Sequence, residues 1–457
     1  MANIYEAMGY SVVRINYLGD WGKNLGLLGV GWQKYGSEEI LNEQADPFRY
    51  IHDLYTKMEE ELRPEQEKRK KARDDGQDAS ALESLGLFAE RDATFKRMED
   101  GEPEAIALWK KLRSISIKYY VETYARLNIN FDEYSGESQV SLDSEAVSQV
   151  ELMLKDKDIW EEQNGAWVID FDKHGAKLGT AAVRDRNGST TYLLRDIATV
   201  FDRLKTHAFD KMVYVVCEQD VHFRQVIKAV ELMGHADIAS KLQHITFTKA
   251  NGPSSHLGNP KLLGDILDQC EKHMHEAIVA NPDQYQTEDC DTTAKVVGIN
   301  SLVLQELSSR KSHSNGLDLN LLTLSEGETG TSLQLCYARV CSEIAKIGLH
   351  PTPEEILHID YTSLSDLPWS ELLRLMARYP EATHSSFKTL DPGTIVSYLF
   401  RVVEELTGCL DDADKAESEG EGSAAGSKFA ARAVLYENVR QILENGMKLL
   451  GATPLSR

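Results

Sequence analysis

Three residues with reactive or hydrogen-bonding side chains lie at the end of a short apolar run and in the polar turn after it: Cys217, Gln219 and His222. A thiol can act as a nucleophile, and an imidazole can carry protons near neutral pH. A cysteine that ends a strand is more often a packing residue, so that interpretation stays open. The turn is therefore a candidate site whose catalytic residue the sequence leaves unknown.

The elements on either side of this turn explain why its position matters. The apolar run from Met212 to Cys217 predicts a strand buried on both faces. After the turn, apolar residues recur at helical spacing up to a predicted stop at Gly234. Open α/β sheets bind ligands just beyond the carboxyl ends of their strands. We therefore expect Gln219 and His222 to line a ligand crevice.

Other segments suggest an α/β part followed by a helical part. Ser11 to Leu18 reads as a buried strand closed by Gly19-Asp20. Residues 53–100 are dense in charge, which favours a solvated helix-and-loop insertion over a dedicated RNA contact. The pattern becomes helical after about Gly348. We expect the acidic and small-residue stretch 411–427 to be a flexible loop before a last amphipathic helix.

Composition excludes several classes of protein. The chain has 457 residues, and its net charge of −23 argues against non-specific coating of nucleic acid but not against tRNA binding. Six scattered cysteines form no CxxC pair, so neither a disulfide framework nor a zinc site is predicted. We find no secretory signal and no apolar run long enough for a membrane. The expected location is the cytoplasm, with no membrane, DNA, metal or cofactor.

Several segments together resemble one family, the cytosolic arginyl-tRNA synthetases of eukaryotes and especially of fungi. They occur in the family's order and span nearly the whole chain. The segments are Asn16 to Lys23 (NYLGDWGK), Tyr134 to Val140 (YSGESQV), Tyr192 to Ile197 (YLLRDI), Phe209 to Met212, Gln219 to His222 (QDVH), and the tail helix Ala433 to Leu450.

This resemblance implies a fold and a division into domains. The expected fold is a Rossmann-like α/β class I core with a parallel sheet, incomplete at its N-terminus, over residues 1–345. A helical insertion is expected at about 53–130. Residues 346–457 would form an all-α domain of the anticodon-binding type.

By the same resemblance, four residues would form a pocket for an arginyl group: Glu137, Tyr192, Asp196 and Gln219. A guanidinium is a planar fork of donors that carboxylates bind in bidentate fashion, which suits Glu137 and Asp196. Tyr192 and Asp196 are four residues apart, so they share a face if this segment is helical. Tyr17, Asp20 and His222 are further candidates for the pocket or for proton transfer.

Two departures from the family pattern concern ATP. The family's HIGH motif precedes a segment like Ala2 to Ala7, and this chain begins at Met1. The stretch that aligns with the KMSKS loop is Gly252 to Asn259, where His256 and Leu257 replace an arginine and a lysine. Because adenylate formation needs cations and helix-end donors on the transferring phosphates, these departures predict a protein that does not use ATP.

The resulting hypothesis is a cyclodipeptide synthase of the fungal type that is derived from arginyl-tRNA synthetase. It would combine arginyl-tRNA with a second aminoacyl-tRNA and release an arginine-containing diketopiperazine. The ester is already activated, so positioning would supply most of the acceleration. The alternatives are a non-catalytic protein that binds tRNA or senses arginine and, ranked last, a truncated arginyl-tRNA synthetase.

Overall fold

The computed structural model describes residues 1–76, 82, 84–142, 144–185, 188, 190–217, 219–247, 262–308, 319–418 and 425–456. The chain divides into two compact units. The first unit comprises Met1–Val12, Thr123–Asn130 and Thr248–Arg457, and the second comprises Val13–Glu122 and Phe131–Phe247.

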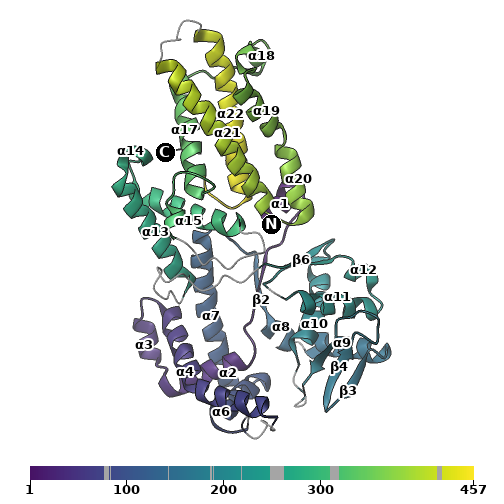
Figure 1. The fold of residues 1–457 in the computed structure, drawn as a ribbon. Helices are drawn as coiled ribbons and strands as arrows, with labels where there is room; N and C mark the ends of the chain where they lie inside the picture. Colours follow the sequence, from purple (N-terminus) through teal and green to yellow (C-terminus); the bar gives the residue numbers. More distant parts are fainter. Residues whose placement is uncertain are drawn as a thin grey trace. The chain divides into compact units, whose positions relative to one another are not determined.

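The second unit contains the α/β part of the chain. Strand β1 (Ile15–Leu18) pairs in parallel with β2 (Glu133–Gly136), and β6 (Met212–Val215) pairs in parallel with β7 (Leu242–Ile245). Helix α10 (Tyr192–His207) packs between α9 (Ser144–Asp156) and α11 (Asp220–Leu232), as Figure 1 shows. Their apolar faces form a core that includes Leu194, Ile197 and Val226, all fully buried.

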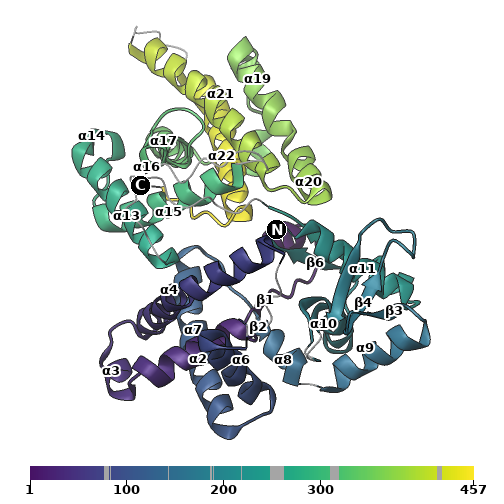
Figure 2. The same ribbon diagram turned by 60° about the horizontal axis from the view of Figure 1, so that its bottom comes forward.

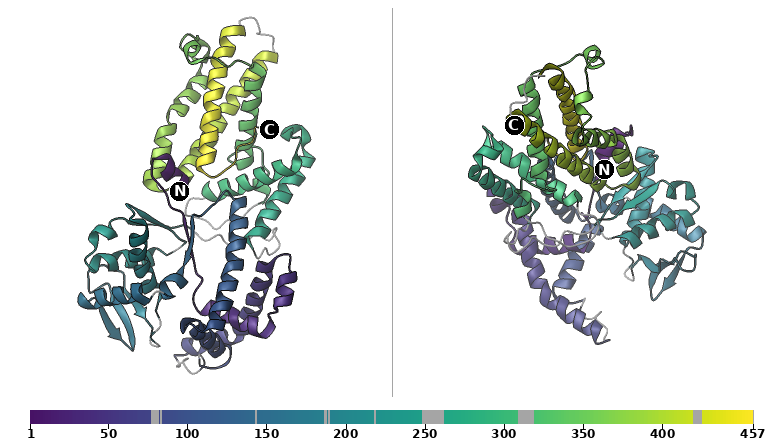
Figure 3. Two further views of the ribbon diagram at one scale, coloured as in Figure 1. Left: turned by 180° about the vertical axis from the view of Figure 1, so that it is seen from behind. Right: turned by 45° about the horizontal axis from the view of Figure 1, so that its top comes forward.

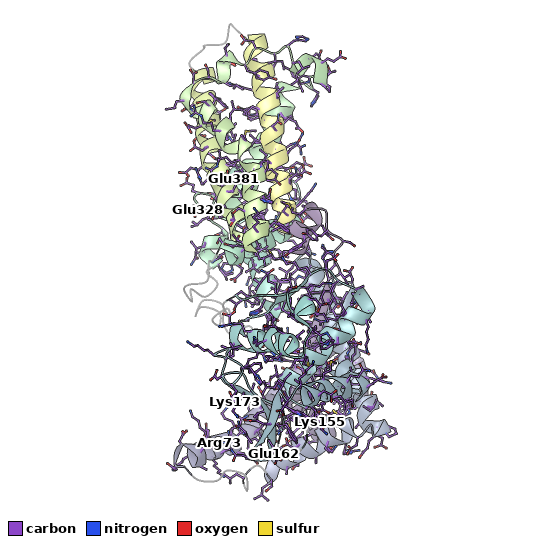
Figure 4. The ribbon with its side chains drawn as sticks, turned by 90° about the vertical axis from the view of Figure 1, so that its right-hand side faces the viewer. Arg73, Lys155, Glu162, Lys173, Glu328 and Glu381 are labelled. Atoms are coloured by element: carbon purple, nitrogen blue, oxygen red, sulfur yellow. The ribbon has the colours of Figure 1, made fainter. Side chains whose placement is uncertain are left out.

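An antiparallel sheet of three strands extends this unit. It is formed by β3 (Trp160–Gln163), β4 (Ala166–Asp170) and β5 (Thr180–Arg184), with β4 in the centre. Trp160 and Trp167 stack on it with ring centroids 4.6 Å apart. Figure 4 labels Glu162 in β3 and Lys173 in the turn after β4.

Helices that begin at Lys23, earlier than the predicted insertion at about 53–130, form most of the rest of the second unit (Figure 2). Helix α2 (Lys23–Tyr35) packs on α4 (Pro47–Asp74) and α6 (Gly86–Glu99), and α7 (Pro103–Arg126) follows them in the chain. Gly26 lies against the backbone of Arg91, where no larger residue fits without a shift. The remaining helices of this unit are α3 (Glu38–Glu43), α8 (Glu137–Leu142) and α12 (Ala236–Ala239).

The first unit is helical among its described residues. Its largest core joins α17 (Gly330–Ile347), α21 (Gly393–Ser418) and α22 (Ala425–Leu449), and Figure 3 shows α22 in yellow beside the other helices of this bundle. The other helices are α1 (Ala2–Ala7), α13 (Leu263–Ala280), α14 (Pro282–Tyr285), α15 (Cys290–Ser308), α16 (Leu319–Leu322), α18 (Pro353–Ile356), η2 (Thr362–Leu364), α19 (Leu367–Ala377) and α20 (Tyr379–Thr389).

Amide side chains fix the extended residues after α22. Asn300 donates to the carbonyl of Thr453 and accepts from its N–H, at 2.7 and 3.0 Å. Asn128 donates to the carbonyl of Gly451 at 2.8 Å. Each side-chain amide therefore makes hydrogen bonds with backbone groups that lie beyond the end of α22 and have no partner within the helix.

Three details differ from the sequence prediction. β6 is not buried on both faces: Met212 to Tyr214 are only partly buried, and the last residue, Val215, is 54% exposed. Helix α21 continues to Ser418, so residues 411–418 are helical, while residues 419–424 of the predicted loop lie outside the described residues. The boundary drawn at residue 345 falls within α17. No helix in the described part of the chain is long and apolar enough to cross a membrane.

Candidate functional site

A tight junction between β1 and β2 builds one wall of the site. The Asp20 carboxylate follows β1 and accepts hydrogen bonds from the N–H and the hydroxyl of Ser138, at 3.0 and 2.9 Å. It also accepts from Nε of Arg113 at 2.5 Å. A Cβ on Gly136 would collide with this carboxylate, so the close approach requires glycine. Asp20 therefore fixes the start of α8, and with it the position of Glu137.

Glu137 and Arg195 form a buried ion pair at the centre of the site. Oε2 of Glu137 lies 3.0 Å from Nη2 of Arg195, and the two residues are only 8% and 6% exposed. They are the only charged residues classed as buried in the part of the chain that the structure describes. Despite the short distance, Glu137 Oε2 and Arg195 Nε have no aligned hydrogen-bond partner.

The buried position of Glu137 changes its acidity. Burial raises the pKa of Glu137 to about 7, against the opposing effect of the Arg195 guanidinium. The negative charges of Asp196 and Asp20 raise this pKa further. The charges around Glu137 are therefore out of balance, because two other carboxylates oppose its ionisation and the Arg195 guanidinium favours it. A positively charged ligand would relieve that imbalance.

Arg195 is held from two further sides. Its Nη1 donates to the carbonyl and the hydroxyl of Thr190, at 2.8 and 3.1 Å. Its Cζ lies 4.8 Å from the ring centroid of Tyr192, within range of a cation–π interaction. Tyr192 begins α10 and is 60% exposed, so its ring lies at the surface of the site and not within its core.

Asp196 and His222 join α10 to α11. Oδ2 of Asp196 lies 2.6 Å from Nε2 of His222, and both side chains are partly buried. As predicted, Tyr192 and Asp196 lie on one helix with the spacing that places them on the same face. A carboxylate fixed to an imidazole can hold a substrate cation or orient the ring for proton transfer.

Tyr17 closes the site from β1. Its hydroxyl lies 3.3 Å from that of Thr199 on α10. Burial raises the pKa of Tyr17, and the charges of Asp196 and Glu137 act in the same direction, so its hydroxyl stays protonated. Cζ of Arg203 lies over the rings of Tyr17 and Tyr214, at 5.0 and 5.9 Å from the ring centroids.

The predicted residues thus separate into three groups. Glu137 and Tyr192 contact Arg195, while Asp196 pairs with His222 and Tyr17 contacts Thr199, on the same helix as Asp196. Asp20 serves as a structural carboxylate whose hydrogen bonds go to Ser138 and Arg113. Exposed Gln219 precedes α11, and Cys217 follows β6 in a partly buried position.

Sequence reasoning missed Arg195, although a signal was present. It lies among the buried apolar residues Leu193, Leu194 and Ile197. A charged residue within such a run is almost never buried without a partner, so a carboxylate partner could have been predicted.

Comparison with known proteins decides the family. Residues 1–317 match the family model described as tRNA synthetases class I (R), catalytic domain, and residues 333–457 match the DALR anticodon binding domain. The chain belongs to the class I arginyl-tRNA synthetase family. The cytoplasmic arginine–tRNA ligase of Saccharomyces cerevisiae is 37% identical over 459 residues, which cover all of this chain and 72% of the yeast protein.

Other members support the same fold. The probable cytoplasmic arginine–tRNA ligase of Schizosaccharomyces pombe is 36% identical, over all of this chain and 72% of its own length. The arginyl-tRNA synthetase structures from Plasmodium falciparum and Thermus thermophilus superpose with TM-scores of 0.77 and 0.76, at 16% identity. They cover all of this chain and 72% and 77% of theirs. The expected class I α/β core followed by a helical anticodon-binding domain is confirmed.

These relatives overturn the prediction of ATP-independent cyclodipeptide synthesis, because the curated proteins that match the whole chain at 31–37% identity are named as arginine–tRNA ligases. The prediction that the protein does not ligate arginine to tRNA is wrong for the same reason. The relatives also give no support to a second aminoacyl-tRNA as a partner.

Neither of the two departures from the family pattern excludes the use of ATP. The start at Met1 supports no conclusion, because the yeast relative extends beyond the 72% that the chain covers. His256 and Leu257 lie outside the described residues. Moreover, backbone N–H groups at helix ends can bind phosphate without a lysine from one loop.

Proposed function

We propose that this chain binds arginine and ligates it to tRNA, with Glu137 and Asp196 as the carboxylates that hold the guanidinium. The single observation that carries this proposal is the buried Glu137–Arg195 pair, whose carboxylate oxygen Oε2 has no aligned hydrogen-bond donor. A buried charge without full partners is costly, so a ligand that supplies donors gains the energy of satisfying it.

The charges around this pair favour a cation of the guanidinium type. The negative charge of Asp196 raises the pKa of Glu137, so the two carboxylates belong to the same site. A guanidinium presents several donors in one plane, whereas an ammonium is a compact point charge. A site with two carboxylates from different helices can therefore distinguish arginine from lysine by geometry.

The other side chains have supporting roles in this proposal. The exposed Tyr192 ring offers a surface for the substrate, and Gln219 would supply a polar contact from the start of α11. His222 holds Asp196 at 2.6 Å and thereby orients its carboxylate. Ester formation from a free carboxylate requires activation, so ATP is the expected co-substrate.

Recognition of tRNA would rest on the helical domain. The match of residues 333–457 to the DALR anticodon binding domain supports this assignment. We also propose the cytoplasm as its location: both yeasts have a relative named as cytoplasmic, although a mitochondrial yeast relative is 34% identical. Fluorescence of a tagged full chain against a mitochondrial marker tests the location.

The test of function is arginine-dependent ATP–pyrophosphate exchange and transfer of radiolabelled arginine to tRNA by the full chain. We expect both activities with arginine and neither with lysine. Binding of arginine or tRNA without either activity would contradict the proposal and favour a non-catalytic protein.

A variant pair tests the pocket assignment. Asp196→Asn should lower kcat/KM for arginine by an amount that corresponds to about 3–5 kcal/mol, because the substrate guanidinium loses a counter-charge in a partly buried site. Asp202→Asn, six residues further along α10, is the matched control and should keep wild-type kcat/KM. Equal activity of the two variants would refute the role of Asp196.

A further inference from the structure

We infer that Arg195 is a positioning residue for arginine recognition: its buried guanidinium favours the ionised form of Glu137 and holds that carboxylate in place for the substrate. This inference rests on the proposed function and adds a residue that acts on the substrate only through Glu137. The proposed pocket for the substrate guanidinium already contains a guanidinium of the protein, that of Arg195, so the role of Arg195 needs an explanation.

The contacts of Arg195 indicate a support and not a competing ligand. Nη1 is fixed by the carbonyl and the hydroxyl of Thr190, and the side chain is only 7% exposed. The residue projects from the first turns of α10, among Leu194 and Ile197, which are fully buried. A guanidinium anchored in this way remains in the core when a ligand enters.

The pair itself leaves capacity for a ligand. Arg195 approaches Glu137 through one nitrogen, Nη2, at 3.0 Å, so the contact is not the two-point fork that arginine makes with a carboxylate at full strength. The Gly19 position lies near Oε1 of Glu137: a Cβ built there would be 4.0 Å from this atom. Arg195 thus neutralises part of the charge and does not occupy the whole carboxylate.

Every charged group that faces Glu137 makes this support necessary. Asp196 from α10 and Asp20, just after β1, both disfavour its ionised form, and the nearby Tyr17 hydroxyl is protonated and carries no charge. Arg113 is engaged with Asp20, and His222 is engaged with Asp196. Arg195 is therefore the cation that acts directly on Glu137 among the described residues.

The consequence is that removal of Arg195 should convert Glu137 into a neutral acid. Burial already raises the pKa of Glu137 to about 7, and an opposite charge in contact typically lowers such a pKa by about 1–3 units. Without Arg195, the pKa should rise by a comparable amount. A protonated carboxyl accepts poorly from a guanidinium, so the substrate would have to displace a proton.

The experiment compares wild type, Arg195→Gln and Arg195→Lys in the full chain. The first measurement is the titration midpoint of the Glu137 carboxyl by carbon-13 NMR, with the Glu137→Gln spectrum as the blank. The second is the arginine Kd between pH 6 and pH 9. We expect Arg195→Gln to raise the midpoint by about 1–3 pH units and Arg195→Lys to restore most of that shift.

The arginine Kd provides a signature that a purely structural role would not give. For Arg195→Gln we expect binding to weaken by roughly 5- to 500-fold at pH 7, where wild-type Glu137 is about half ionised, and to recover substantially at pH 9, where Glu137 ionises again. Arg126→Gln is the control, because it removes another partly buried arginine that pairs with Glu271 at 2.9 Å. It should leave both midpoint and Kd unchanged.

The possible failures are distinguishable. An unchanged midpoint in Arg195→Gln overturns the inference even if wild type binds arginine. Wild type that binds no arginine refutes the proposed function, whatever the midpoint does. If Arg195→Gln does not fold, Thr190→Val removes the hydroxyl contact at 3.1 Å and should shift the midpoint upward by a smaller amount. A Thr190→Val midpoint equal to that of wild type would then overturn the inference.

Discussion

The site around Glu137 and the helical bundle around Leu406 use burial for opposite purposes. The bundle core joins α17, α21 and α22 through apolar side chains, and its buried polar residues are uncharged. The site buries a carboxylate and a guanidinium whose polar atoms remain partly unsatisfied. The bundle gains stability because apolar surface is removed from water. The site instead keeps buried charges whose desolvation is not fully compensated, and a ligand of opposite charge can compensate it.

The largest expected effect comes from Glu137→Gln. Loss of the charge leaves Arg195 buried without a counter-charge and removes one partner of the substrate. The resulting fall in kcat/KM for arginine should correspond to a loss of about 3–5 kcal/mol in transition-state stabilisation. Steady-state kinetics with varied arginine provides the measurement, and circular dichroism verifies the fold. Near wild-type kinetics would show that the site does not use this charge.

Leu406→Ala should give the reverse pattern. Leu406 is fully buried in the bundle, so its truncation should lower the free energy of unfolding by about 2–5 kcal/mol. Arginine affinity of the folded protein should not change. Denaturant unfolding and calorimetric binding measure the two quantities, and a matching loss of affinity would contradict the separation between the regions.

Gly136→Ala tests whether the backbone of the site is as constrained as its charges suggest. The added methyl would meet the Asp20 carboxylate, which must then move away from Ser138 and Arg113. We expect about 1–3 kcal/mol of lost stability together with weaker arginine binding. As a control, Gly408→Ala in α21 meets no atom within 4 Å and should be tolerated. Equal tolerance of both substitutions would argue against the tight junction.

The smallest expected effect is the pH dependence of the wild type. Because the pKa of Glu137 is raised to about 7, the empty site takes up a proton as the pH falls through 7. A cationic ligand must expel this proton, so arginine affinity should fall by up to about tenfold per pH unit below 7. Calorimetry in buffers of different ionisation enthalpy should detect proton release. A flat affinity from pH 6 to pH 8 would refute this coupling.

The sequence by itself determined the order of the α/β and helical parts and the family resemblance, whereas its pocket residues stay a prediction. Period 3.6 in α11 and the four-residue spacing of Tyr192 and Asp196 are local properties, and the helices formed where this spacing predicts them. The motif segments also carried the class I core and the anticodon-binding tail, because their chemistry is tied to residue type.

Only the tertiary structure decided how the charges pair. Glu137 and Arg195 are 58 residues apart in the sequence (195 − 137 = 58), and nothing local assigns Arg195 to Glu137 or Arg113 to Asp20. The altered acidity of Glu137 follows from desolvation, which depends on every element that covers it. Burial and charge pairing are properties of the folded chain, so they could not be predicted from spacing alone.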